Sequence, residues 1–110
     1  MRNLFGLSLL LVGCTTDYET FSSELPVAGC DYAADCGGGL GRNPLCEDSL
    51  AASLEDLAQD ADCEYREQQA SQCIRELTAD TCDEKTAVYY ECKRTFRGEG
   101  CELDLLDILY

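Results

Sequence analysis

Histidine and tryptophan are absent from this chain of 110 residues, and proline occurs only twice. Without histidine, the usual acid–base side chain, the Ser-His-Asp triads and the common zinc sites are all missing. Ser49, Ser53 and Ser71 lack a Gly-x-Ser-x-Gly context or an adjacent lysine. No Cys-x-x-Cys pair is present either, which removes the usual dithiol-exchange spacing. We therefore expect no enzymatic activity, no metal site and no cofactor.

Positive charge is scarce. Lysine and arginine number 8 against 22 acidic residues, for a net charge of −14. A field of this sign repels nucleic acid, so no nucleic-acid partner is expected, and it suits basic protein partners or loosely held divalent cations. No Asp-x-[Asp/Asn]-x-[Asp/Asn]-Gly loop is present, so nothing predicts an EF-hand calcium site.

Cysteine, in contrast, is abundant, at 9 residues. A chain this short buries only a modest core, and cysteine at this level is typical of a domain that disulfides stabilise. Such a framework predicts an oxidising compartment, such as a periplasm or the cell exterior.

The chain also lacks a hydrophobic run long enough to span a bilayer. Its apolar stretch, residues 4–12, follows Arg2 and suits a signal peptide. The stretch ends in Leu11-Val12-Gly13-Cys14, which resembles the lipobox of bacterial lipoproteins. That resemblance implies cleavage after Gly13, a thioether-linked lipid on Cys14 and attachment to a membrane. In bacterial lipoproteins an aspartate directly after the lipidated cysteine favours retention in the inner membrane. Here Thr15 occupies that position, so the resemblance favours the outer membrane.

Cysteine parity agrees with this interpretation, because lipidation of one of the nine leaves eight cysteines for disulfides. We expect a signal peptide at residues 1–13, a lipidated cysteine and flexible tether at 14–29, and a cysteine-rich helical domain at 30–110. The tether is predicted because residues 15–29 are polar with scattered apolar residues and no clear period. Cleavage also removes Arg2, which would bring the net charge to −15.

Two amphipathic helices are predicted between Cys63 and Phe96, where less polar residues recur at offsets 0, +7, +10 and +14 from Cys63 and again from Cys82. A short connection at residues 78–81 makes them antiparallel neighbours. Facing residues of an antiparallel pair have numbers that add to a constant. Cys63 with Cys92 and Cys73 with Cys82 share one such constant, so the spacing predicts these two disulfides.

This spacing resembles the twin Cys-x9-Cys proteins of the coiled-coil-helix-coiled-coil-helix type. In that family the two motifs lie on an α-hairpin linked outer-to-outer and inner-to-inner, which implies the same two pairs, Cys63–Cys92 and Cys73–Cys82. The remaining four cysteines allow three pairings, which the sequence leaves open: Cys30, Cys36, Cys46 and Cys101.

One or two further helices are expected to pack with this hairpin. Asn43-Pro44 is a helix entry, and the stripe that begins at Leu50 and Leu54 predicts a helix over residues 44–61. A short helix is predicted in the tail after Cys101. The glycine-rich segment 37–41 is not followed by the Lys-Ser/Thr of a phosphate-binding loop, and it predicts a turn. The fold class is therefore all-α: a small, disulfide-stapled helical domain.

For function, we expect a membrane-anchored, cysteine-rich lipoprotein of the bacterial cell envelope. It would act as a structural or protein-interaction module with an unknown protein partner. The alternative is a periplasmic metal-binding or thiol-redox protein.

Overall fold

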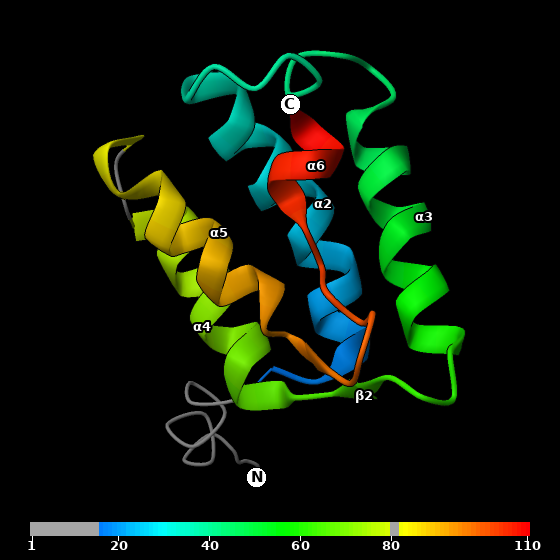
Figure 1. Cartoon of the computed structure of the whole chain (residues 1–110). Coiled ribbons are helices and arrows are strands. Elements are labelled where there is room, and N and C mark those ends of the chain that lie inside the picture. Colours follow the sequence, from blue (N-terminus) through cyan, green and yellow to red (C-terminus); the bar gives the residue numbers. More distant parts are fainter. Residues whose placement is uncertain (1–15, 80–81) are drawn as a thin grey trace, which may run out of the picture.

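Helix α2 (Tyr18–Asp35) lies between the other helices of the computed structural model, which describes residues 16–79 and 82–110 (Figure 1). Asp17 is its N-cap, and the Asp17 carboxylate accepts a hydrogen bond from the Thr20 backbone N–H at 2.8 Å. This hydrogen bond lowers the pKa of the Asp17 carboxyl. Phe21 and Leu25 are completely buried in the core.

Helix α2 corrects the predicted tether at residues 14–29 and the predicted domain start at Cys30. From Tyr18 to Gly29 the chain is helical, and several of these residues belong to the core. The described fold therefore begins near Thr16, whose carbonyl accepts a hydrogen bond from the Tyr65 hydroxyl at 2.5 Å. The leader, the lipobox and Cys14 lie outside the described residues.

Helix α3 (Cys46–Gln59) confirms the helix predicted over residues 44–61, with a later start. The Asn43 side chain accepts a hydrogen bond from the Leu45 backbone N–H at 2.8 Å, so it forms a turn ahead of the helix. Leu50 and Leu54 are buried as expected. Their main packing partners differ from the prediction, however, because α3 packs chiefly against α2 and also against α6.

Helices α4 (Glu67–Ala79) and α5 (Lys85–Lys93) form the predicted antiparallel hairpin. A 3-10 turn, η1 (Cys82–Glu84), precedes α5. The hairpin is thus shorter than expected, since Cys63 precedes α4 and Cys82 lies before α5.

The four disulfides are Cys30–Cys46, Cys36–Cys82, Cys63–Cys101 and Cys73–Cys92. All eight cysteines predicted to form disulfides do so, but the predicted pairs Cys63–Cys92 and Cys73–Cys82 are wrong. The shortened helices explain the error: Cys73, inside α4, faces Cys92 near the end of α5. Cys63 and Cys82 lie outside the two α-helices and bond to other parts of the chain.

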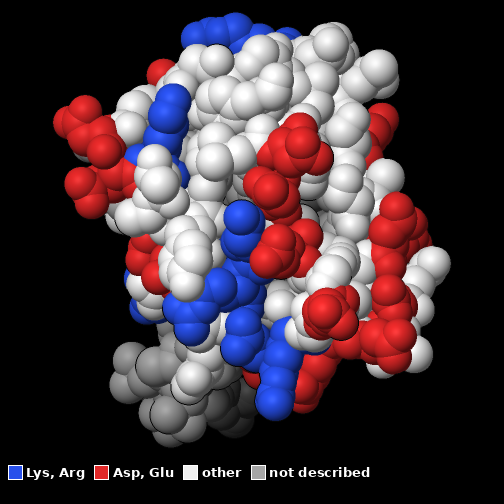
Figure 2. Space-filling view, viewed as in Figure 1, with Lys and Arg blue, Asp and Glu red and all other residues white. Residues whose placement is uncertain are grey.

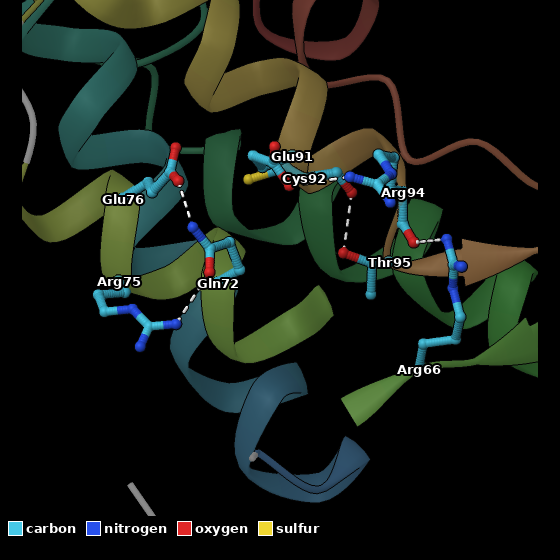
Figure 3. Close-up of polar contacts among 8 residues, drawn as sticks. All are labelled: Arg66, Gln72, Arg75, Glu76, Glu91, Cys92, Arg94 and Thr95. Carbon is cyan, nitrogen blue, oxygen red and sulfur yellow. Dashed lines mark hydrogen bonds and ion pairs between the residues drawn. The ribbon is translucent and has the colours of Figure 1, made fainter. Parts of the chain in front are cut away.

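A two-stranded antiparallel ribbon closes the open end of the hairpin, where the sequence predicted only helix and turn. Strand β2 (Glu64–Tyr65) pairs with β3 (Phe96–Arg97). The Cys63–Cys101 disulfide lies beside it. Arg66 donates a hydrogen bond to the Arg94 carbonyl at the same end (Figure 3).

The C-terminal tail docks on the core through α6 (Leu105–Leu109), which confirms the short helix predicted after Cys101. Leu103, Leu105 and Leu109 are fully buried. The glycine-rich turn passes close to α2: a Cβ on Gly41 would lie 2.3 Å from the Ala34 backbone nitrogen. Only glycine permits this approach.

Replacing Leu25 with alanine tests whether residues 18–29 belong to the fold. We expect the free energy of unfolding to fall by about 2–5 kcal/mol, because the change leaves a cavity in the core. Val27→Ala is the control, since Val27 lies on the same helix and is 47% exposed. This substitution should lower the free energy of unfolding by less than about 1 kcal/mol. Chemical denaturation measures both, and equally small effects would support a tether.

Non-reducing tryptic mapping tests the disulfide pairing. Cleavage after lysine and arginine isolates four cysteines on separate peptides: Cys73, Cys82, Cys92 and Cys101. We expect peptide 67–75 to be joined to peptide 86–93 alone, through Cys73–Cys92. All other cysteine peptides of the folded domain should form one linked unit. A link between peptides 67–75 and 76–85 would instead support the pairing that the spacing predicts.

Candidate interaction groove

A groove runs between α2 and α4 on the side that α5 and α6 leave uncovered. It consists of two adjoining hollows, each of about 460 Å³, that share Ala28, Asp31 and Thr78. We call this the α2–α4 groove. Its other lining residues come from α2, α4 and the adjacent Cys36–Cys82 disulfide: Ser23, Glu24, Val27, Tyr32, Asp35, Cys36, Ile74, Leu77 and Cys82.

Helical spacing explains the α2 wall. Glu24, Val27, Ala28, Asp31 and Asp35 stand at offsets 0, +3, +4, +7 and +11, so they share one face of the helix. The side of the helix turned away from this wall, which includes Gly29 and Ala33, is buried in the core. One helix therefore supplies both the centre of the core and a wall of the groove.

The hollow lined by Val27 and Ile74 is mainly apolar, the hollow beside Cys82 is about half polar, and the rim of both is acidic. Ile74 and Leu77 of α4 contribute buried or half-buried aliphatic surface, and Val27 of α2 remains 47% exposed. Glu24 and Asp31 are exposed at the rim. Neither hollow has a lysine or arginine among its lining residues.

The groove carboxylates also have no cationic neighbour within ion-pair distance in the described ranges. Acidic residues on the α4–α5 hairpin differ in this respect (Figure 3). There, Glu91 pairs with Arg94 at 3.4 Å, and Glu76 accepts a hydrogen bond from the neutral amide of Gln72. The negative charge of the groove is thus uncompensated by the fold.

Two basic side chains reach the C-terminal end of α2, where helix carbonyls lack partners. Arg42 donates to the Ala34 carbonyl at 3.1 Å, and Lys85 donates to the Cys36 carbonyl at 3.5 Å. Lys85 also lies 5.2 Å from the centre of the Tyr110 ring. Both cations therefore act within the fold, outside the groove lining.

A second group of polar side chains, three tyrosines, lies near the C-terminus. The Tyr89 and Tyr110 hydroxyls are 2.9 Å apart, and the Tyr32 ring packs edge-on against Tyr89. Burial, followed by the hydrogen bond to Tyr110, raises the pKa of the Tyr89 hydroxyl far above its usual value. Burial likewise raises the pKa of Tyr65. Both hydroxyls stay protonated at neutral pH, so neither is prepared to accept a proton.

The residues predicted from sequence as site residues are the cysteines, and within the described part of the chain they act as cross-links. Only Cys36 and Cys82 line the groove. Nowhere in the described ranges do three His, Cys, Asp or Glu side chains gather in a way that would hold a metal ion. The described helices also include none with the length and apolarity needed to cross a bilayer.

The sequence analysis missed the groove because it assigned residues 18–29, the first two thirds of α2, to a tether and residues 30–35 to a loop. The spacing of Glu24, Ala28, Asp31 and Asp35 at helical intervals is a signal that could have revealed that face, with Asp17 as the helix start.

Comparison with known proteins adds no relative: no protein-family model, curated protein or solved structure gives a significant match.

Partial reduction tests which disulfides are accessible to a reductant in the folded protein. Cys82 is exposed at the end of the groove, whereas Cys73 and Cys92 are both 0% exposed. A thiolate or phosphine must reach a sulfur atom to attack it, so we expect Cys36–Cys82 to be reduced first and Cys73–Cys92 last. Alkylation followed by peptide mapping at increasing reductant gives the order. Early loss of Cys73–Cys92 would contradict the burial of that pair.

Proposed function

We propose that this chain is a membrane-anchored, cysteine-rich lipoprotein of the bacterial cell envelope, and that it acts as a protein-interaction module without catalysis. The observation that carries the interaction role is the α2–α4 groove, an open and partly apolar surface whose rim carboxylates have no ion-pair partner among the described residues. Grooves with an apolar floor and a polar rim are typical of binding sites.

The Leu11-Val12-Gly13-Cys14 sequence supports the anchor, and the start of the fold supports a close attachment. A chain of two residues spans at most about 7 Å, so a lipid on Cys14 would lie next to Thr16. The Thr16 carbonyl accepts a hydrogen bond from Tyr65 of the β2–β3 ribbon. The ribbon end of the domain would therefore face the bilayer, with little tether between them.

The charge distribution agrees with this orientation. Figure 2 shows basic side chains gathered over the end of α5 and β3, the elements that contain Lys93 and Arg97. They lie at the ribbon end of the face shown, where they form its largest basic group; smaller basic groups lie at the opposite end, and acidic side chains lie on both sides (Figures 1 and 2). Anionic head groups repel carboxylates and attract lysine and arginine, so this end is the better suited to approach a membrane.

The thiol-redox alternative receives less support, because the eight cysteines from Cys30 to Cys101 are all in disulfides. We also propose attachment to the outer membrane, because Thr15, and not aspartate, follows the lipobox cysteine.

Intact mass of the protein extracted from membranes tests the anchor. We expect loss of residues 1–13, added acyl chains on Cys14, and a gain of eight hydrogens on reduction of the four disulfides. Cys14→Ser should remove the acyl chains and release the protein from the membrane fraction, because the thioether cannot form. Thr15→Ser is the matched control and should stay lipidated. An unmodified Cys14 in the membrane-extracted protein would overturn the lipoprotein assignment.

A further inference from the structure

We propose that the α2–α4 groove binds a basic amphipathic helix of a partner protein. This inference rests on the proposed interaction role and names the partner's chemistry. It does not depend on the lipid, because the groove consists only of described residues between Ser23 and Cys82.

The walls of the groove favour a helix. Both walls are helices, and neither β2 nor β3 contributes to the lining, so no free strand edge is offered to an extended peptide. From Ser23 to Cys36 the α2 wall rises about 20 Å, at 1.5 Å per residue. That length matches a partner helix of about three to four turns.

The floor of the groove supplies apolar contact along this length. Val27 and Ile74 lie in one hollow, and Leu77 in the other. Ala28, whose side chain is small, lines both hollows, which leaves room for partner residues spaced by one helical turn. Leucine-like residues at offsets 0, +3, +4 and +7 on a partner helix would meet these hollows.

Charge identifies the polar face of the partner. Glu24 and Asp31 are exposed on the rim, Asp35 follows on the same helix face, and none of them has an ion-pair partner within residues 16–79 and 82–110. Lysine or arginine beside the apolar stripe of a partner would meet these carboxylates. An acidic partner would meet repulsion from the rim and from the whole acidic chain.

The probe is a synthetic peptide of about 18 residues with leucines at the four offsets and lysines on both sides of the stripe. One control peptide keeps the leucines and replaces every lysine with glutamate. Another keeps the composition but spreads the leucines around the helix. Binding to the purified full chain in a neutral non-ionic detergent is measured by calorimetry, with detergent alone as the blank.

Asp31→Lys tests the rim and Asp56→Lys is its control. Both positions are exposed, both changes alter the net charge equally, and Asp56 lies on α3 outside the groove. We expect Asp31→Lys to weaken binding of the basic peptide by about tenfold and Asp56→Lys by less than about twofold. Equal losses would show attraction to the overall charge and would overturn the proposal.

Val27→Asn tests the floor, with Leu45→Asn as the control. Val27 is 47% exposed and Leu45 is 62% exposed, so neither change opens the core. We expect only Val27→Asn to weaken binding of the basic peptide, by about fivefold. Circular dichroism and thermal unfolding show whether each variant keeps the fold.

Three outcomes would contradict the proposal. The first is no saturable binding of the basic peptide. The second is equal binding of the scrambled or glutamate peptide. The third is a dimer of the chain that Asp31→Lys dissociates and Asp56→Lys does not, since the groove would then hold a second copy. If the lipoprotein assignment is wrong, the intact mass will show no acyl chains on Cys14, and these peptide affinities will be unchanged.

Discussion

Burial of α2 is the constraint on which the rest of the structure depends. Helices α3, α4 and α6 all pack against this helix, and Phe21 and Leu25 supply fully buried side chains at its centre. Two disulfides attach its second half to other elements, through Cys30 and Cys36. A small domain with a limited core gains from such cross-links, because they restrict the unfolded chain. Without α2, the α4–α5 hairpin and α3 would share little contact surface.

The same helix also connects the core to the proposed functions. Its inner face holds the fold together, while its outer face forms the acidic wall of the α2–α4 groove. Its N-terminal end lies beside the β2–β3 ribbon and follows Cys14 closely in sequence. A lipid on Cys14 would therefore place the groove at a short, defined distance from the bilayer, with the axis of α2 leading away from it.

The sequence predicted α3, the α4–α5 hairpin and α6, because each has a clear apolar stripe, a helix-start signal or both. It missed α2 for two physical reasons: Pro26 stands inside the helix, where its missing N–H disfavours helix, and apolar residues occur on more than one face of a helix with several packing partners. It also missed the β2–β3 ribbon, since strands of two residues carry no periodic signal. The groove was missed together with α2, because a binding face cannot be predicted on a segment assigned to a tether.

Disulfide pairing illustrates the same limit and also bears on binding. The number of cysteines predicted that they form disulfides, but the partners depend on where each helix begins. Because α4 begins at Glu67 and α5 at Lys85, later than expected, both predicted pairs in the hairpin changed. The resulting Cys36–Cys82 bond joins the end of α2 to the turn after α4, at one end of the groove. It therefore limits how far the two walls can move apart. A groove whose walls are fixed before binding loses less conformational entropy when a partner helix enters, so the cross-link that stabilises the fold also favours recognition.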